Sequence, residues 1–243
     1  MSLRPRAITP SPRALPRRLE VLLPLIGKVD CLADVGTDHA LLPAHAVLRG
    51  VCQRAVAVDF REEPLRRASV TLSRLGVSDR IILLRGDGLA ALEQTAVDVV
   101  VLAGLGGRTL LSWCRAAPGV IQRAQRLIVQ PNRHLAELRA WAYSAGLWLI
   151  DENICREGER FFVSCAFAPG SGPDPAYAES ALPLEHAFEL GPWLVRRCVP
   201  EAVEHWGQEA VRIRELVAAG RVEHTARLAA YEAGCRVGSI GVI

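Results

Sequence analysis

The sequence contains no long apolar run, and this sets it apart from membrane proteins. None of its apolar stretches approaches the roughly 20 residues that a membrane-spanning helix needs. Near the N-terminus, residues 21–26 are apolar, but they are few and Pro24 interrupts them, so we expect no signal peptide. Of the 243 residues, 50% are apolar and 23% charged, which allows a sizeable core. We expect a cytoplasmic protein with one ordinary domain and a smaller appendage.

Lysine is almost absent, since Lys28 is the only one among 29 basic residues. Two explanations for the arginine excess stay open here. A G+C-rich genome favours arginine codons, whereas arginine also makes bidentate phosphate contacts that lysine cannot make. The formal net charge is only +3, so the placement of the arginines is more informative than their number.

Cysteine pairs with metal-ligand spacing are also missing. The seven cysteines are scattered without a C-x-x-C motif or a Cys/His cluster, and several lie in apolar runs. An odd number in this arrangement is typical of buried, reduced thiols and not of a disulfide framework or a zinc site. We therefore predict no metal and no disulfide. The cysteines are Cys31, Cys52, Cys114, Cys155, Cys165, Cys198 and Cys235.

The charge is unevenly distributed along the chain. Residues 1–19 hold five arginines and no acid, residues 20–168 carry a net charge of +1, and residues 169–243 carry −3. The leading segment is also rich in proline, so it is either a flexible terminus with incidental charge or a tether for a polyanion. A second group of arginines follows the second expected strand, namely Arg61, Arg66, Arg67, Arg74 and Arg80. The net acidic tail is a poor candidate for the main phosphate contact.

Short apolar runs alternate with helical patterns between residues 30 and 168, which indicates a parallel sheet with helices on both faces. Several of the runs are almost continuously apolar, as strands buried on both faces are. The last two lie close together around Gly158 and indicate a hairpin. Five strand–helix units closed by a hairpin predict the α/β, Rossmann-like sheet of class I methyltransferases. The expected strands are 30–35, 54–59, 81–85, 97–103, 126–130, 148–154 and 160–168, and the clearest helices are 64–75 and 134–145.

The domain boundaries follow from composition. We predict a flexible basic arm over residues 1–16, a catalytic domain over 17–168, a linker over 169–176 and a helical domain over 177–243. In the last segment, apolar residues recur every three or four positions from Val199 to Val217, which indicates one amphipathic helix. Gly220 is the expected stop, and residues 223–233 are expected to form a second, shorter helix of a small hairpin.

The first candidate site is the turn that follows the first expected strand. Gly36 allows the backbone to turn tightly and approach a ligand. The further glycines of a dinucleotide fingerprint are missing, and Asp34, Thr37 and Asp38 surround the single glycine. Two carboxylates suit a cationic ligand such as S-adenosyl-L-methionine and would repel a pyrophosphate. The alternative is a structural turn in which Asp38 caps the next helix.

Two further carboxylates mark the carboxyl ends of the second and third expected strands, since Asp59 ends the second and Asp87 follows the third. Asp59 can accept hydrogen bonds from both ribose hydroxyls of an adenosine, although it also suits a helix N-cap. Asp87 can accept from an adenine amino group while Gly88 leaves room for the ring, and the alternative is a simple turn. Each motif is weak by itself. Together they mark the carboxyl ends of adjacent strands, where open α/β sheets bind ligands.

Two more segments follow the fourth and fifth expected strands. The first is glycine-rich and exposes backbone beside the expected methyl donor, unless it is only a packed turn; it comprises Ala103, Gly104, Leu105, Gly106 and Gly107. The second is Gln130-Pro131-Asn132, whose two amides can bind the edge of a nucleobase. Its alternative is an N-cap for the next helix. His39 lies close to the first turn and is either a helper residue or structural.

These strings resemble the TrmK family of bacterial tRNA (adenine-N1)-methyltransferases. The resemblance is carried by DVGTDHALLP at 34–43, GDGL at 86–89, AGLGG at 103–107 and QPN at 130–132, and it extends over roughly residues 15–195. Two positions depart from the family pattern, which usually has glutamate at Asp59 and methionine at Leu105. Both replacements keep the character of the side chain, so neither threatens cofactor binding.

The resemblance implies a domain that binds S-adenosyl-L-methionine, followed by an antiparallel coiled coil, and methylation of N1 of adenine 22 in the tRNA D-arm. We expect Asp38 to stabilise the charge that develops on the base, Gln130 and Asn132 to hold its edge, and His39 to assist. The short second helix predicts a truncated coiled coil, which places its role in tRNA docking in doubt. Methylation of another RNA or a small molecule, and a non-catalytic RNA-binding module, stay open as alternatives.

Overall fold

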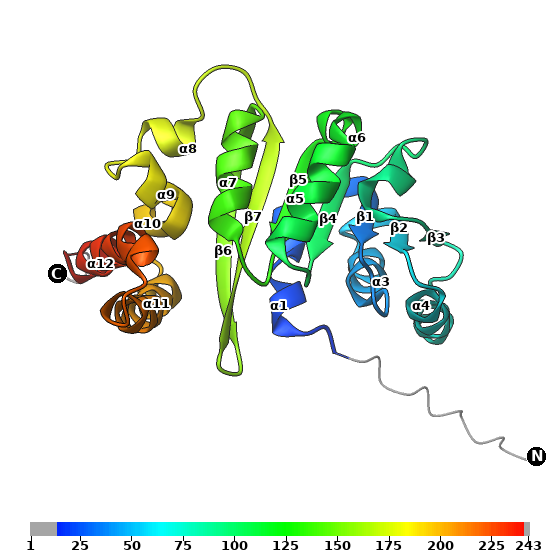
Figure 1. Ribbon diagram of the computed structural model, residues 1–243. Helices are drawn as coiled ribbons and strands as arrows, with labels where there is room; N and C mark the ends of the chain where they lie inside the picture. The colour runs from blue at the N-terminus through cyan, green and yellow to red at the C-terminus, as the bar shows by residue number, and fades with distance from the viewer. Residues whose placement is uncertain (1–13, 241–243) are drawn as a thin grey trace, which may run out of the picture.

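The computed structural model describes residues 14–240, which form a seven-stranded sheet with helices on both faces (Figure 1). The strand order is β3-β2-β1-β4-β5-β7-β6, in which β6 and β7 form the antiparallel hairpin and the other strands are parallel. This confirms the predicted Rossmann-like methyltransferase sheet. The strands are β1 (Val29–Val35), β2 (Cys52–Asp59), β3 (Ile81–Arg85), β4 (Val99–Ala103), β5 (Arg126–Gln130), β6 (Leu147–Glu157) and β7 (Arg160–Pro169).

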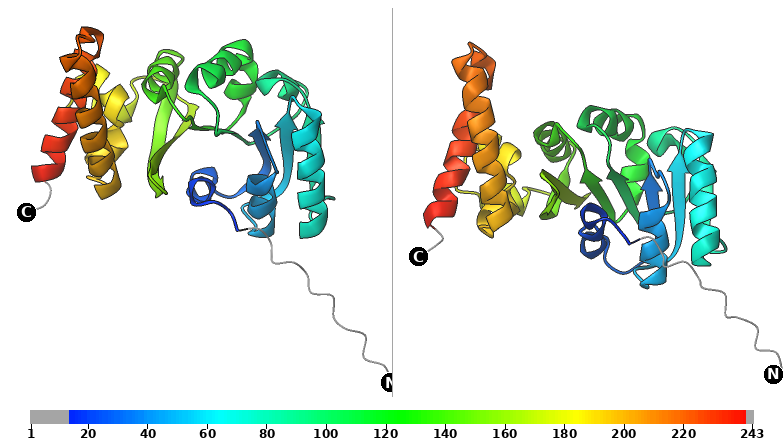
Figure 2. Two further views of the ribbon diagram at one scale, coloured as in Figure 1. Left: turned by 60° about the horizontal axis from the view of Figure 1, so that its bottom comes forward. Right: turned by 90° about the horizontal axis from the view of Figure 1, so that it is seen from below.

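The helices separate into two layers around this sheet and a C-terminal group beside it (Figures 1 and 2). α1 to α4 contribute to one layer, and α5 to α7 with the 3-10 turn η1 contribute to the other. The helices are α1 (Arg17–Glu20), α2 (Leu23–Ile26), α3 (Leu41–Leu48), α4 (Glu62–Leu75), η1 (Gly88–Leu92), α5 (Gly107–Ala116), α6 (Pro118–Arg123), α7 (Leu135–Ser144), α8 (Pro175–Ala178), α9 (Leu184–Leu190), α10 (Pro192–Arg196), α11 (Pro200–Ala218), η2 (Val222–His224) and α12 (Thr225–Ile240).

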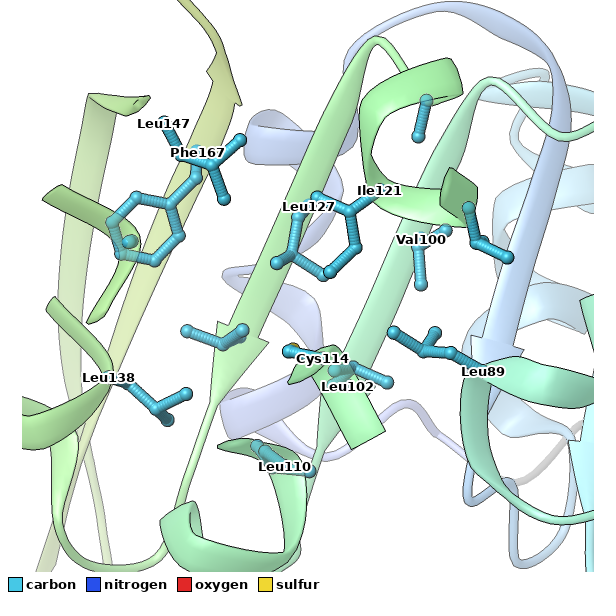
Figure 3. Packing of buried hydrophobic residues seen from close by; sticks show 14 of the residues in the cluster. Leu89, Val100, Leu102, Leu110, Cys114, Ile121, Leu127, Leu138, Leu147 and Phe167 are labelled. Carbon is cyan, nitrogen blue, oxygen red and sulfur yellow. The ribbon is translucent and has the colours of Figure 1, made fainter. Parts of the chain in front are cut away.

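Each central strand contributes side chains to both faces of the sheet because successive residues alternate in direction. On one face, Val100 and Leu102 of β4 pack with Leu127 of β5 against Leu110 and Ile121 of the covering helices (Figure 3). On the opposite face, the intervening strand residues pack against α2, α3 and α4. Burial on both faces explains the nearly continuous apolar strands and fixes the register of the loops at their ends.

The part of the chain beyond β7 packs against the edge strand β6 and forms a third core. Residues 170–174 contain no helix or strand, and α11 and α12 lie side by side as a hairpin (Figure 2). The expected end of the second helix at residue 233 is wrong, because α12 continues to Ile240. A Cβ atom on Gly234 would lie 2.8 Å from Cδ2 of Leu190 and 2.9 Å from Cε3 of Trp206. This glycine permits close packing and does not end the helix, so the hairpin is less truncated than predicted.

A buried ion pair joins the C-terminal helices to the sheet. Nε of Arg139 in α7 donates to Oε1 of Glu152 in β6 at 2.8 Å, and the two side chains are 1% and 0% exposed. Nη1 of Arg139 also donates to the carbonyls of Phe188 and Glu189, while Oε2 of Glu152 accepts from the amide of Trp193. Removal of either partner would leave the other as an uncompensated buried charge, which is strongly destabilising.

Further expectations from the sequence concern the N-terminal arm, the cysteines, membrane-spanning helices and metal sites. Residues 1–13 of the predicted basic arm lie outside the described residues, and Leu15 is buried in the core that α2 and α3 share. None of the seven cysteines, all of which lie within the described residues, forms a disulfide. Within residues 14–240, no helix has both the length and the apolar composition to span a bilayer. The same part of the chain contains no cluster of three or more side chains suited to bind a metal ion.

Candidate active site

The turn after β1 brings the backbone close to its neighbours, as Gly36 predicts. Gly36 has a φ of +84°, and its amide and that of Thr37 donate to the carbonyl of Val58 at 2.8 and 2.9 Å. A Cβ on Gly36 would lie 2.9 Å from Cδ1 of Leu105 in the loop after β4. The glycine is therefore required both for its backbone conformation and for the approach of Leu105. Two of the predicted ligand segments meet here.

Asp34 provides a buried carboxylate at the end of β1. It is 7% exposed, and burial raises its pKa to about 6, while the Thr37 hydroxyl and the positive charge of Arg18 oppose that rise. A buried carboxylate in its charged form costs free energy unless other groups compensate the charge. A cationic ligand group at this position would offset that cost, so the residue fits the ammonium and sulfonium charges of S-adenosyl-L-methionine.

Asp38 lies in the same turn, but its side chain is in solvent and not buried. Its side chain is 62% exposed, and its carboxylate is 2.7 Å from Nη2 of Arg67 in α4 and 3.3 Å from Nε2 of His39. The N-cap position of α3 is occupied by Ala40, and no side chain caps this helix. The alternative in which Asp38 caps α3 is therefore wrong. The structure brings Asp38 and His39 together.

Asp59 and the residue after it form the next part of the carboxyl edge. Asp59 is buried at the end of β2, and its Oδ1 accepts from the amide of Arg61 at 2.9 Å, so one oxygen stabilises the turn into α4. Its second oxygen has no hydrogen bond within residues 14–240. Phe60 is 65% exposed and was missed by the sequence interpretation. An exposed aromatic ring beside the expected ribose ligand suits stacking on adenine, and its apolar character directly after an acidic strand end was the available signal.

Asp87 and Gly88 follow β3, and the structure gives them different roles. Asp87 is exposed and its side chain does not cap η1, which leaves its carboxylate available to a ligand. Gly88 has a φ of +54°, and a Cβ there would lie 2.5 Å from ring atoms of Trp113. Packing of the Trp113 ring therefore requires this glycine, whether or not a ligand also approaches it.

The loops after β4 and β5 are tied together by a ladder of hydrogen bonds. Nδ2 of Asn132 donates to the carbonyl of Gly104 at 2.7 Å, and the backbone amide of Asn132 donates to the carbonyl of Leu105 at 2.8 Å. The amide of Gly107 donates to the carbonyl of Arg133 at 3.0 Å. His134, and not Asn132 or Arg133, occupies the N-cap position of α7, so the helix-capping alternative is wrong. Asn132 is exposed, and its Oδ1 lies at the open edge of the predicted site.

Gln130 is located at the end of β5 but is buried. It is 1% exposed, and its Nε2 donates to the carbonyl of Arg18 at 2.7 Å and to Oγ of Ser164 at 2.8 Å. Its side chain therefore holds α1 against the carboxyl edge of the sheet. The structure does not place Gln130 beside Asn132 as a second exposed amide.

Arg18 lies beside the candidate site, and the sequence analysis did not single it out, because it treated the basic residues near the N-terminus as a flexible terminus or a tether. α1 lies below the carboxyl ends of β4 and β5 (Figure 1). Nη1 of Arg18 lies 3.8 Å from the position that a Cβ of Gly104 would occupy. α1 has only four residues, so its pattern of basic residues is too short to predict this arrangement from the sequence.

A groove extends from the β5 loop to the C-terminal hairpin. Its volume is about 660 Å³, and it runs from Asn132 and His134 to α11 and α12. Burial lowers the pKa of His205 on its wall, and the rings of Phe161 and His205 are 5.3 Å apart. Arg212 and Arg227 also line the groove. It was not foreseen because it joins residues that are distant in sequence.

Known proteins resemble this chain in both sequence and structure. A family model described as a methyltransferase domain matches residues 15–164. The tRNA (adenine(22)-N(1))-methyltransferase of Bacillus subtilis (strain 168) is 30% identical over 195 residues, or 80% of this chain and 81% of that protein.

Two solved structures extend this comparison. Streptococcus pneumoniae Sp1610 in complex with S-adenosyl-L-methionine has a TM-score of 0.81 at 29% identity and covers 91% of this chain and 100% of its own. The B. subtilis M1A22 tRNA methyltransferase TrmK shares the fold, with a TM-score of 0.79 at 24% identity over 95% of this chain and 99% of its own. The agreement extends beyond the sheet, because both alignments also cover most of the C-terminal helices.

Proposed function

The chain belongs to the TrmK family of tRNA (adenine(22)-N1)-methyltransferases, and from this membership we propose that it methylates N1 of adenine 22 in the D-arm of tRNA. The observation that carries the proposal is the position of the five predicted segments, all of which lie at the carboxyl ends of adjacent strands. We also propose a location in the cytoplasm, because the proposed substrate is a tRNA.

We propose that the residues of β1 to β4 hold S-adenosyl-L-methionine, which supplies an electrophilic methyl group when bound. Asp34 offers a buried carboxylate for a cationic group, and Asp59 and Asp87 offer acceptors for the adenosine. The backbone of the turns contributes through residues with little or no side-chain bulk. The other proposed binding residues are Gly36, Thr37, Gly88, Ala103, Gly104, Leu105 and Gly106. The expected contact of Asp38 with the cofactor is not retained, because its exposed carboxylate pairs with Arg67.

The target base needs positioning more than activation. Adenine N1 has an in-plane lone pair, so it can attack a methyl group directly once its base pair is open, which costs a few kcal/mol. Nδ2 of the Asn132 side chain already donates to the carbonyl of Gly104. Its Oδ1 can therefore accept a hydrogen bond from the adenine amino group. We propose Gln130 as a positioning residue for α1, and Asn132 as the residue that holds the base edge.

The methylated base is cationic near neutral pH, so a nearby carboxylate stabilises charge that grows in the transition state. We propose Asp38 for this electrostatic role, with His39 beside it as a helper. Its exposed position is compatible with contact to a large substrate. Alignment of donor and acceptor supplies the larger part of the acceleration, and no residue has to remove a proton from N1 before attack.

The test is mass spectrometry of tRNA after incubation with the protein and S-adenosyl-L-methionine. We expect 1-methyladenine at position 22 of an unmodified tRNA transcript. The matched control is the same transcript with guanine at position 22, which should remain unmethylated. Methylation at another position, or of ribosomal RNA but not tRNA, would contradict the proposed substrate.

A further inference from the structure

Trp113 in α5 packs against two of the turns that carry the proposed cofactor ligands. A Cβ on Gly88 would lie 2.5 Å from Cγ and Cδ1 of its indole and 2.6 Å from Cδ2, so the five-membered ring packs directly on the turn after β3. At the other end of the ring, Cη2 lies 4.0 Å from the position that a Cβ of Gly36 would occupy in the turn after β1. One planar side chain therefore spans the turn that follows Asp34 and the turn that contains Asp87.

The turn after β3 has a neighbouring strand on one side only. β3 is the edge strand, so among the described residues only β2 pairs with it. The amide of Gly86 donates to the carbonyl of Asp59 at 3.1 Å, which holds the turn on the β2 side. On the face of the sheet that α5 covers, the ring of Trp113 packs against Gly88. A smaller side chain there would leave a cavity beneath the turn, into which the turn could relax.

Trp113 supports these turns by packing and not by hydrogen bonding. Within residues 14–240 its Nε1 makes no hydrogen bond, whereas Nε1 of Trp148 and of Trp193 donate to backbone carbonyls at 3.2 and 2.8 Å. The ring is partly buried against the core that α5 shares with the sheet. The other four tryptophans belong to α7, β6, α10 and α11, which all follow β5 in the chain.

We propose that Trp113 is a positioning residue for the adenosine part of S-adenosyl-L-methionine. Its indole fixes the separation of the turns after β1 and β3, and thereby places the carboxylate of Asp87 against the adenine amino group. This inference rests on the proposed function. The position of the turn matters because such a hydrogen bond needs a donor–acceptor distance of about 2.7–3.2 Å. The competing role for Trp113 is core packing that stabilises the domain without an effect on recognition of the base.

Calorimetry with S-adenosylhomocysteine and S-inosylhomocysteine tests the proposal without measuring activity. The second compound has a carbonyl in place of the adenine amino group, so it has no donor for Asp87 at that position. We expect the unmodified protein to bind the first about 10- to 100-fold more tightly, because hydrogen bonds to charged groups are among the stronger ones. In Trp113→Leu, this ratio should fall to about threefold or less, since the turn is no longer held in place.

Trp141→Leu is the matched control for loss of a tryptophan ring. Trp141 in α7 packs against the same core, so its replacement should lower the Tm but retain the ratio. Asp87→Ala tests the acceptor itself and should abolish the preference for S-adenosylhomocysteine. Combined with Trp113→Leu, it should cause no further fall, because two substitutions that remove one contact are not additive. If Trp113→Leu is not folded at the working temperature, Trp113→Phe takes its place, with a partial fall in the ratio expected.

Each possible result has a separate meaning. An unchanged ratio in Trp113→Leu, with a lowered Tm, overturns the proposal and leaves Trp113 as core packing. An equal fall of the ratio in Trp141→Leu also overturns it, because the effect would then be one of general destabilisation. A ratio that survives Asp87→Ala overturns it as well, since Asp87 would not accept from the amino group. If the unmodified protein binds neither compound, the proposed methyltransferase function itself fails, independently of Trp113.

Discussion

Two carboxylates four residues apart in the same turn have opposite environments. Asp34 is buried, and its pKa is raised to about 6, whereas Asp38 is exposed and ion-paired with Arg67. Burial disfavours the charged form of Asp34, whereas the carboxylate of Asp38 lies in solvent beside a guanidinium. This difference supports the proposed roles, in which Asp34 binds the ligand that enters the sheet edge and Asp38 acts on the substrate that approaches from solvent.

Asp34 should make the stability of the ligand-free protein depend on pH. Its pKa of about 6 in the folded state exceeds the ordinary aspartate value of 3.8, so the native state retains a proton that the unfolded chain releases. The free energy of unfolding therefore decreases as pH rises between about 4 and 6. Asp34→Asn should stabilise the protein relative to the unmodified chain, and this gain should be about 1 kcal/mol larger at pH 7.5 than at pH 5.

Urea unfolding at the two pH values measures this difference. Calorimetry on the same variant should show weaker binding of S-adenosylhomocysteine, because its ammonium loses a carboxylate partner. Asp174→Asn is a control for these measurements. Burial also raises the pKa of Asp174, but this residue is distant from the proposed site in sequence and structure. An equal gain in stability at both pH values would contradict the assignment to Asp34.

Asp38→Asn should separate catalysis from cofactor binding. Loss of the negative charge removes the proposed stabilisation of the cationic product, so we expect kcat for tRNA methylation to fall by at least about tenfold. Affinity for S-adenosylhomocysteine should change by less than about threefold. Glu63→Gln is the matched control, because Glu63 is the other carboxylate that pairs with Arg67, and kcat should be unchanged there. Full activity of Asp38→Asn would remove this residue from the mechanism.

The positions of the site residues could be predicted from the sequence, but their environments could not. Asp34 and Asp59 lie at the carboxyl ends of apolar strands and Asp87 follows one, and that pattern alone places them at one edge. Burial of Gln130 depends on α1, which crosses the strand end from 112 positions earlier in the chain. Arg18 was missed for the same reason. Contacts between distant segments carry no local periodicity, so only the folded chain reveals them.

Elements with strong periodicity were predicted well, and those defined by tertiary contacts were not. β3 and β5 begin and end at the predicted residues because each is a short apolar run between turns, although β5 is buried between neighbours and β3 is a partly exposed edge strand. β6 extends to Glu157, three residues beyond the prediction, because β7 pairs with it up to the hairpin turn. α12 was predicted too short because glycine has a low helix propensity. At Gly234, tight packing against Trp206 outweighs that propensity.

Two glycines in the hairpin should therefore respond in opposite ways to the same substitution. A Cβ on Gly207 in α11 would meet no atom within 4 Å, whereas a Cβ on Gly234 would lie within 3 Å of two side chains. Gly207→Ala should stabilise the protein by about 0.5–1 kcal/mol through helix propensity. Gly234→Ala should destabilise it by about 1–3 kcal/mol through overpacking. Thermal unfolding measures both, and a stabilised Gly234→Ala would show that α11 and α12 are not closely packed there.

The distribution of charge over the molecule limits where tRNA can be held by its phosphates. Along the groove, Arg212 pairs with Glu209 and Arg227 with Glu189. On α4, Arg66 pairs with Glu62, and Arg67 with two acids. Paired arginines gain less from a phosphate, because each must first give up a carboxylate. This agrees with the sequence prediction that the acidic helical tail is not the main phosphate contact. It also means that Arg66 and Arg67 of the second arginine group are expected to contribute less to tRNA binding.

The arginines of residues 1–13 are then the strongest remaining candidates for phosphate contact. This segment holds Arg4, Arg6 and Arg13 with no acidic residue. Each phosphate contact releases counterions, so the slope of log K against log salt becomes steeper by about 0.7–0.9 per contact. Deletion of residues 1–13 should weaken tRNA binding and make this slope shallower by up to about 2.7.

A full-length variant with Arg4, Arg6 and Arg13 replaced by glutamine separates charge from chain length. It should reproduce the shallower slope while S-adenosylhomocysteine binding stays unchanged, since the proposed cofactor site lies at the sheet edge. Fluorescence titrations of tRNA at several salt concentrations give both slopes. A slope equal to that of the unmodified protein would mean that the arm makes no phosphate contact, and its arginine content would then follow from codon usage alone.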